Sequence, residues 1–160
     1  MRLQIRATQV LTAVGVLAFA AVGAAAVAQY MFDMQPCPWC VLQRFIYIVI
    51  GVLALLAALF GGSLRRGTAW LALLAGLSGI ASALWQQLYA ASQASCDLTL
   101  AERITTALHL DRLLPQLFIA YASCADAAVN VLGIPFAVWS CAMFVLLSGL
   151  LFWTLRSSKR

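Results

Sequence analysis

Long apolar stretches dominate the pattern of hydrophobic and polar positions along this chain. Four of them come close to the roughly 20 residues that an α-helix needs to cross a hydrocarbon core of about 30 Å. Lipid offers no partner to an unpaired backbone group, so each stretch is expected to be helical. The expected spans cover residues 10–28, 41–60, 69–89 and 136–155. The pattern therefore predicts an all-α membrane protein, a single domain over residues 1–160 built as a four-helix transmembrane bundle.

Composition supports the membrane assignment. The chain is 64% hydrophobic and 9% charged, whereas soluble domains are about 45–50% apolar and about 25% charged. The first stretch also fits a secretory signal peptide, because Arg2 and Arg6 precede it and residues 24–28 resemble a small-residue cleavage site. Its apolar run exceeds the roughly 7–15 residues usual for such a peptide, which favours a membrane span.

The placement of charge predicts the orientation, because basic residues favour the cytoplasmic side of a membrane. The basic residues that would share one side are Arg2, Arg6, Arg65, Arg66, Arg156, Lys159 and Arg160. The acidic residues all fall on the other side: Asp33, Asp97, Glu102, Asp111 and Asp126. We expect a multi-pass membrane protein with both termini cytoplasmic and two outward-facing loops, at about 29–39 and 90–135. The net charge of +5 follows from this sorting and gives no reason to propose nucleic-acid binding.

The two longer connections carry further signals. In the second outer loop, Leu100, Ile104, Ala107 and Leu108 recur at helical spacing. This pattern predicts a short amphipathic helix on the outer bilayer surface, which is compatible with packing against the mouth of the bundle. On the inner side, residues 61–67 contain three glycines and two arginines and are expected to form a tight turn.

A Cys-x-x-Cys pair, Cys37 and Cys40, stands at the entry to the second span. Pro36 and Pro38 suit the start of a helix, where a missing N–H group costs little. A helix N-terminus and a nearby cation both favour a thiolate. Arg44 follows Cys40 by one helical turn and is the only charged residue inside the expected spans. Such a residue is a functional-site hypothesis, with snorkelling to the headgroups as the alternative.

The other cysteines allow several interpretations. Cys96 and Cys124 lie in the long outer loop, which would face an oxidising compartment. Zinc binding is disfavoured, because these two are far apart in the chain and His109 is the only histidine. Purely structural disulfides would explain Cys96 and Cys124 but not a Cys-x-x-Cys pair beside an intramembrane arginine. Redox chemistry is therefore preferred. Cys141, inside the fourth span, is expected to be a packing residue, and His109 to lie on the loop surface.

Three motifs together carry a resemblance to a known family. They are Pro36-Cys37-Pro38-Trp39-Cys40 followed by Arg44; Trp85-Gln86-Gln87-Leu88 before Cys96; and Cys124-Ala125 followed by Val131-Leu132-Gly133-Ile134-Pro135 and Trp139. In this order and topology, the sequence resembles the DsbB family of bacterial disulfide bond formation proteins over nearly its whole length. It departs from many members at Trp39, where they have Leu, and at Leu88 and Tyr89, a stretch where they carry a His.

The resemblance implies a thiol:quinone oxidoreductase of the bacterial inner membrane with two redox-active disulfides, Cys37–Cys40 and Cys96–Cys124. A periplasmic thioredoxin-like, DsbA-type oxidase would pass its electrons to the loop pair, through a mixed disulfide with Cys96. Cys40, beside Arg44, would then reduce a membrane quinone, either ubiquinone or menaquinone.

Further expectations concern the quinone pocket and the alternatives. Trp39, Phe45 and Trp85 are expected to provide aromatic walls for the quinone. A vitamin-K-epoxide-reductase-like oxidoreductase is the alternative enzyme, although its Cys-x-x-Cys pair usually comes late in the chain. A non-catalytic membrane scaffold with structural disulfides is the alternative outside enzymes.

Overall fold

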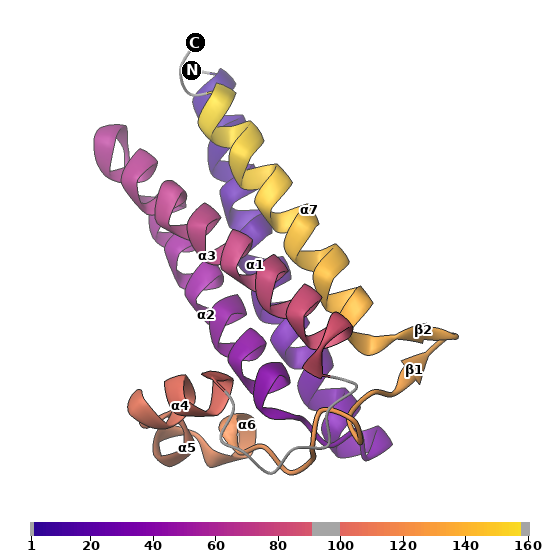
Figure 1. Ribbon diagram of the computed structural model, residues 1–160. Helices are drawn as coiled ribbons and strands as arrows, with labels where there is room; N and C mark the ends of the chain where they lie inside the picture. Colours follow the sequence, from indigo (N-terminus) through magenta and orange to yellow (C-terminus); the bar gives the residue numbers. More distant parts are fainter. Residues whose placement is uncertain (1, 91–99, 158–160) are drawn as a thin grey trace.

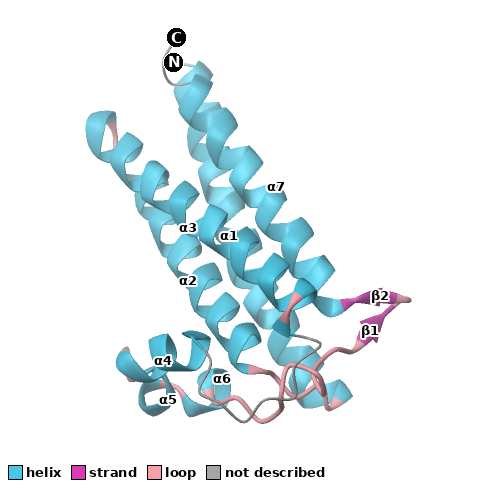
Figure 2. Cartoon of the chain, in the orientation of Figure 1, coloured by secondary structure: helices cyan, strands magenta, loops and turns pink. Residues whose placement is uncertain are grey.

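Four long helices form the body of the protein. The computed structural model describes residues 2–90 and 100–157. The long helices are α1 (Arg2–Phe32), α2 (Pro38–Leu59), α3 (Gly62–Leu88) and α7 (Phe136–Ser157). Each is long and apolar enough to cross a membrane, and helix accounts for most of the described chain (Figure 2). The predicted all-α, four-helix membrane bundle is confirmed.

Short elements connect α3 to α7. They are α4 (Leu100–Ala107), α5 (Leu110–Leu113), α6 (Pro115–Phe118), β1 (Asn130–Val131) and β2 (Ile134–Pro135). The two strands pair as an antiparallel hairpin, with Val131 opposite Ile134. Leu132 and Gly133 make its turn, both with positive φ.

The long helices pack in a closed ring, in which α1 contacts α2, α2 contacts α3, α3 contacts α7 and α7 contacts α1. Both termini and the turn between α2 and α3 lie at one end of the bundle (Figure 1). Helices α4 to α6 lie at the other end, where α4 and α6 contact α2. The α1–α2 and α3–α7 connections are therefore gathered at the end where α2 begins.

The helices extend beyond the expected spans, and the expected inner turn over residues 61–67 is wrong. Only Phe60 and Gly61 separate α2 from α3. Gly62, with a φ of +59°, allows the chain to reverse at once. The Arg65 side chain then donates to the carbonyl oxygens of Ala57 (3.2 Å) and Phe60 (2.9 Å). Because this guanidinium caps the end of α2, the residues around it remain helical instead of forming a loop.

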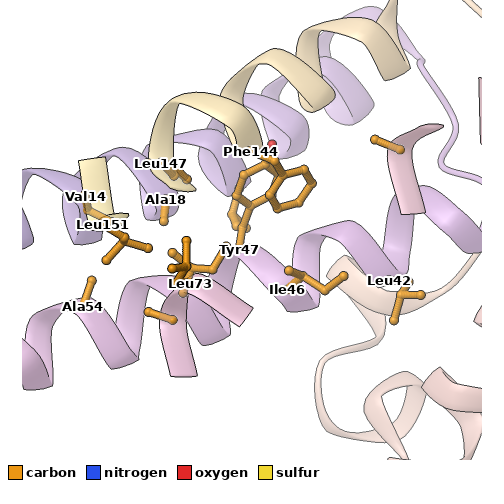
Figure 3. Packing of buried hydrophobic residues seen from close by; sticks show 14 of the residues in the cluster. Val14, Ala18, Leu42, Ile46, Tyr47, Ala54, Leu73, Phe144, Leu147 and Leu151 are labelled. Carbon is orange, nitrogen blue, oxygen red and sulfur yellow. The ribbon is translucent and has the colours of Figure 1, made fainter. Parts of the chain in front are cut away.

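Aromatic stacking and close helix approach hold the middle of the bundle together. The rings of Tyr47 on α2 and Phe144 on α7 stack with centroids 4.0 Å apart (Figure 3). Gly79 on α3 lies directly against the Phe144 ring, so that a Cβ atom at position 79 would overlap it. Membrane helices use small residues in this way to bring their backbones together.

The short helix α4 packs against the bundle through a face that the sequence pattern did not single out. Ala101 and Thr105 are the buried residues of α4, whereas Leu100, Ile104 and Leu108 are exposed. Small residues therefore make the contact with the protein, which leaves the larger apolar side chains free to face lipid. The amphipathic helix is present where it was predicted, with its apolar face turned outward.

Replacing Gly79 with alanine should destabilise the bundle. The added methyl group would force the Phe144 ring off its stack with Tyr47, and overpacking of this kind costs about 1–3 kcal/mol. Gly149→Ala, on the exposed side of α7 with nothing within 4 Å, is the control and should leave stability unchanged or slightly higher. The free energy of unfolding in detergent micelles, followed by circular dichroism, measures both. Equal stabilities for the two variants would contradict this packing.

Candidate functional site

The predicted Cys-x-x-Cys pair lies at the N-terminus of α2. Cys37 is the N-cap residue, with an extended backbone, and Pro38 occupies the first turn. The Cys37 sulfur accepts a hydrogen bond from the Cys40 backbone N–H at 3.4 Å, and the two sulfurs are 3.0 Å apart. Both cysteines are present as thiols in this arrangement. Their separation leaves only a small rotation to the S–S bond length of about 2.05 Å.

Arg44 is buried one turn below Cys40. One terminal guanidinium nitrogen donates to Gln29 Oε1 (2.7 Å) and to the Leu117 carbonyl oxygen (3.1 Å), and the other donates to the Ala25 carbonyl oxygen (3.2 Å). The remaining nitrogen, Nε, is buried without a hydrogen-bond partner among the described residues. The side chain is thus directed into the protein, between α1 and α6, and does not snorkel to the outer surface.

A cavity of about 170 Å³ opens beside these two residues. Small alanines of α1 form one wall, α2 and α7 form others, and residues 34–36, 127 and 129 of the connecting segments contribute the rest. Its lining includes Ala21, Ala24, Ala25, Ala28, Cys40, Gln43, Arg44, Tyr47, Phe136, Trp139, Ser140 and Met143. A mostly apolar hollow with a few polar groups is typical of a small-molecule site.

The expected aromatic walls are wrong. Trp39, Phe45 and Trp85 do not line the cavity. Trp39 instead pairs with Trp85 of α3 (centroids 6.5 Å apart), and Phe45 pairs with Phe118 of α6 (6.5 Å). Trp39 and Phe45 leave α2 on faces other than the one shared by Cys40 and Arg44, and Trp85 lies on α3. Tyr47, Phe136 and Trp139 supply the aromatic lining.

Cys124 lies beside Cys37, although the two are far apart in the chain. The backbone N–H groups of Tyr121 and Ala122 donate to the Pro36 carbonyl oxygen (3.0 and 3.3 Å), which fixes the segment before Cys124 against the start of α2. The Cys37 thiol is hydrogen-bonded to Cys124 and to Cys40, and these bonds together with burial raise the pKa of Cys37. The hydrogen bond from Cys37, reinforced by the Trp39 backbone N–H, lowers the pKa of Cys124.

The remaining candidate residues are placed as follows. Cys96 lies outside the described residues. Cys141 lies on α7, partly buried against the core, as expected of a packing residue. His109 is exposed on the loop between α4 and α5, as predicted.

Comparison with known proteins settles the family. A family model described as "Disulfide bond formation protein DsbB" matches residues 7–154. The chain belongs to the DsbB family. It is 36% identical to Disulfide bond formation protein B of Cupriavidus metallidurans (84% of each chain covered). It is 38% identical to the protein of that name from Ralstonia nicotianae (84% and 85%) and 33% identical to Disulfide bond formation protein B 1 of Pseudomonas savastanoi (88% and 85%). No solved structure matches the chain.

Membership of the DsbB family makes this chain a membrane protein of a disulfide-forming group. The match also sets aside the vitamin-K-epoxide-reductase-like assignment considered from the sequence, because it spans nearly the whole chain. The side chains that surround the cysteines of this protein are identified by its structure and not by the family assignment.

Several polar residues of this DsbB-family site were missed by the sequence reasoning. Gln29, Gln43 and Gln86 are buried around Cys40 and Arg44, and Ser140 lies among them. The available signal was their position inside or at the edge of apolar spans, where a polar side chain needs a partner. Gln86 did stand in one of the motifs of the resemblance, but the sequence reasoning assigned none of these uncharged residues a place beside the cysteines.

The contact between Cys37 and Cys124 predicts how their thiols respond to pH. A lowered pKa means a larger thiolate fraction at a given pH, so Cys124 should be alkylated at lower pH than Cys37 in the reduced protein. Cys37→Ala removes the hydrogen bond and should move the Cys124 profile to higher pH, whereas Cys141→Ala should not. Residue-resolved mass spectrometry after brief alkylation over a pH series measures this. An unmoved Cys124 profile in Cys37→Ala would show that the contact has no influence on the Cys124 thiol.

Proposed function

We propose that this protein is a membrane thiol:quinone oxidoreductase that reoxidises a periplasmic thioredoxin-like, DsbA-type oxidase. The observation that carries the proposal is the placement of the Cys37–Cys40 pair between two features. Cys37 contacts Cys124 of the outer loop, while Cys40 lines the cavity together with Arg44. The pair can therefore exchange with a loop cysteine on one side and meet a small oxidant on the other.

The exchange between the two pairs follows from this geometry. We propose that the reduced partner first transfers two electrons to the Cys96–Cys124 disulfide, through a mixed disulfide with Cys96. A Cys124 thiolate then attacks the neighbouring Cys37 sulfur and displaces Cys40 as a thiolate. Cys96 in turn attacks the Cys37–Cys124 bond, restoring Cys96–Cys124 and leaving Cys37 and Cys40 reduced. At this step Cys37 is in its disulfide and carries no proton, so the Trp39 backbone N–H is the donor that favours the attacking Cys124 thiolate.

The residues around Cys40 fit a quinone head group. A cavity of about 150 Å³ is large enough to bind benzene, and the one here is about 170 Å³. Arg44 Nε is a buried donor without a partner among the described residues, so it is available to a carbonyl oxygen. When bound there, a quinone supplies the oxidant, since it takes up the two electrons and two protons released as the Cys37 and Cys40 thiols form their S–S bond. Ubiquinone and menaquinone share these carbonyl groups.

The same proposal includes the location. Arg65 and Arg156 lie toward the end of the bundle that holds both termini, whereas Glu102, Asp111 and Asp126 lie on or near the outer connections. Because basic residues favour the cytoplasmic face, we propose that the termini are cytoplasmic and that the cysteine pairs face the periplasm across the bacterial inner membrane. That compartment is oxidising, so disulfides persist there.

The test is an assay with purified protein, a quinone and a reduced thioredoxin-like partner, in which quinone absorbance is followed over time. Changing Cys37, Cys40, Cys96 or Cys124 to Ser should each abolish turnover, because each carries electrons in the proposed route. Cys141→Ser should retain it. Full turnover in the Cys96→Ser, Cys124→Ser double variant would remove the loop pair from the route, and no turnover by the unmodified protein would leave the non-catalytic scaffold as the better description.

Arg44→Ala should slow quinone reduction more than tenfold, equivalent to about 1.4 kcal/mol in the barrier. The change removes a buried cation beside Cys40, together with Nε, the guanidinium nitrogen that has no hydrogen-bond partner among the described residues. Arg44→Lys should be intermediate, because it keeps the charge but not the planar fork. Single-turnover oxidation of the partner without quinone should be little changed. Arg103→Ala, on the exposed face of α4, is the matched control and should leave the rate unchanged. If quinone reduction in Arg44→Ala runs at the wild-type rate, the quinone does not bind beside Arg44.

A further inference from the structure

A chain of buried hydrogen bonds runs through three helices and ends on the Cys37–Cys40 pair. Gln86 of α3 donates from Nε2 to the Cys40 sulfur at 3.2 Å and lies 3.5 Å from the Cys37 sulfur. Gln86 Oε1 accepts from Gln43 Nε2 of α2 at 2.7 Å. Gln43 Oε1 in turn accepts from the Ser140 hydroxyl of α7, also at 2.7 Å.

Tyr47, one turn along α2 from Gln43, holds Ser140 in place at the start of the chain. Its hydroxyl donates to the Ser140 carbonyl oxygen at 2.9 Å and lies 3.1 Å from Ser140 Oγ. Its ring is held by the stack on Phe144. Gln43, Gln86 and Tyr47 are each about 5% exposed or less and Ser140 is partly buried, so these bonds lie in surroundings of low polarity that strengthen them.

The acceptor at the end of the chain fixes the direction of every bond in it. A thiolate has no proton to give, so only an N–H group satisfies it. Gln86 must then present its NH₂ group to the sulfurs and its oxygen to Gln43. Gln43 must likewise present its NH₂ group to Gln86 and its oxygen to Ser140. The donors of Ser140, Gln43 and Gln86 consequently all point toward the Cys40 sulfur, so each of these bonds polarises the next.

The chain is unnecessary for packing. Apolar residues of the same size in these positions would avoid the cost of carrying amides and hydroxyls into a membrane, and buried polar networks often contribute less stability than their apolar replacements. The Tyr47 ring already ties α2 to α7 by stacking. A polar chain that ends on a reactive sulfur is therefore better explained by the chemistry of that sulfur.

The chain also leaves the cavity open. Cys40, Gln43, Tyr47 and Ser140 line the cavity, whereas Gln86 does not. The sulfur can therefore be held by Gln86 from outside the cavity while its cavity side remains free. Among the described residues, the titratable groups acting on Cys40 are Cys37 and Arg44 on its own helix and Cys124 from the outer loop, so Gln86 adds an uncharged donor to this set.

We propose that Gln86 is a positioning residue for Cys40, and that the chain from Ser140 through Gln43 to Gln86, with Ser140 held in place by Tyr47, stabilises the Cys40 thiolate. Its consequence for electron transfer rests on the proposed function. A disulfide whose reduced form is stabilised is a stronger oxidant, so the chain makes the Cys37–Cys40 pair a better acceptor for electrons from the outer loop. It also keeps Cys40 in the anionic form that passes electrons on.

Gln86 variants test the direct contact. The reduced protein, without quinone or partner, is treated briefly with iodoacetamide over a pH series, and modification of Cys40 is read by residue-resolved mass spectrometry. Gln86→Leu should move the Cys40 profile about one pH unit higher, a loss of about tenfold in reactivity below the midpoint. Gln86→Glu should move it further, because a carboxylate would face the thiolate. A profile unmoved in both variants would overturn the proposal.

Ser140→Ala tests the chain at a distance from the sulfur and guards against a folding defect in the Gln86 variants. It should move the Cys40 profile in the same direction by a smaller amount, because Gln43 loses the donor that orients it. Ser148→Ala is the matched control two turns along α7, where the buried hydroxyl has no partner among the described residues, and should leave the profile unchanged. Identical Cys40 profiles in Ser140→Ala and Ser148→Ala would show that the chain does not act on Cys40.

The redox potential of the Cys37–Cys40 pair gives an independent readout, measured by equilibration with thiol–disulfide buffers in the Cys96→Ser, Cys124→Ser background. The potential should fall in Gln86→Leu and stay unchanged in Ser148→Ala, and an unchanged potential in Gln86→Leu would contradict the proposal. Neither readout uses a quinone or a partner protein. Failure of the proposed function would therefore appear in the turnover assay alone, and failure of this inference in the alkylation profiles.

Discussion

A bilayer supplies no hydrogen-bond partners, so every polar group that four helices carry into it must find one within the protein. In this bundle those groups are not spread evenly along the helices. Arg44, Gln29, Gln43 and Gln86 gather at the outer end of α2, beside Cys40. Polar residues are costly inside a bilayer because they need hydrogen-bond partners. Here they supply partners to one another and to the reactive sulfur.

The start of α2 coordinates the rest of the site. Cys37 as N-cap and Pro38 in the first turn place one sulfur toward the outer loop and the other along the helix face that carries Arg44. The long connection contacts this region twice: its backbone donates to the Pro36 carbonyl oxygen before the first turn, and its Leu117 carbonyl oxygen accepts from Arg44 in the second turn. Movement of this connection would therefore shift the start of α2 and both cysteines with it. Such coupling suits a pair that is proposed to exchange with Cys124.

The cavity depends on a balance between small and large side chains. Alanines of α1 leave space opposite Cys40, while lower in the bundle Gly79 lets α3 approach Phe144 closely. Tight packing in the middle and open packing near the outer end are thus properties of the same four helices. This arrangement keeps the scaffold rigid below a site that must accept a ligand.

The sequence by itself determined the four spans, the Cys-x-x-Cys pair at a helix start and the amphipathic α4, because hydrophobic length, helix-start residues and helical period are local properties. It misjudged the 61–67 turn, since the Arg65 contacts that keep this segment helical join two helices. It also misplaced the aromatic walls, because the side chains that line a cavity depend on how α1, α2 and α7 rotate against one another. Only the tertiary structure brought Cys124 to Cys37 and joined Gln86, Gln43 and Ser140 into one chain that Tyr47 holds in place. These residues come from distant segments, and the hydrogen bonds that unite them form only when the helices have packed.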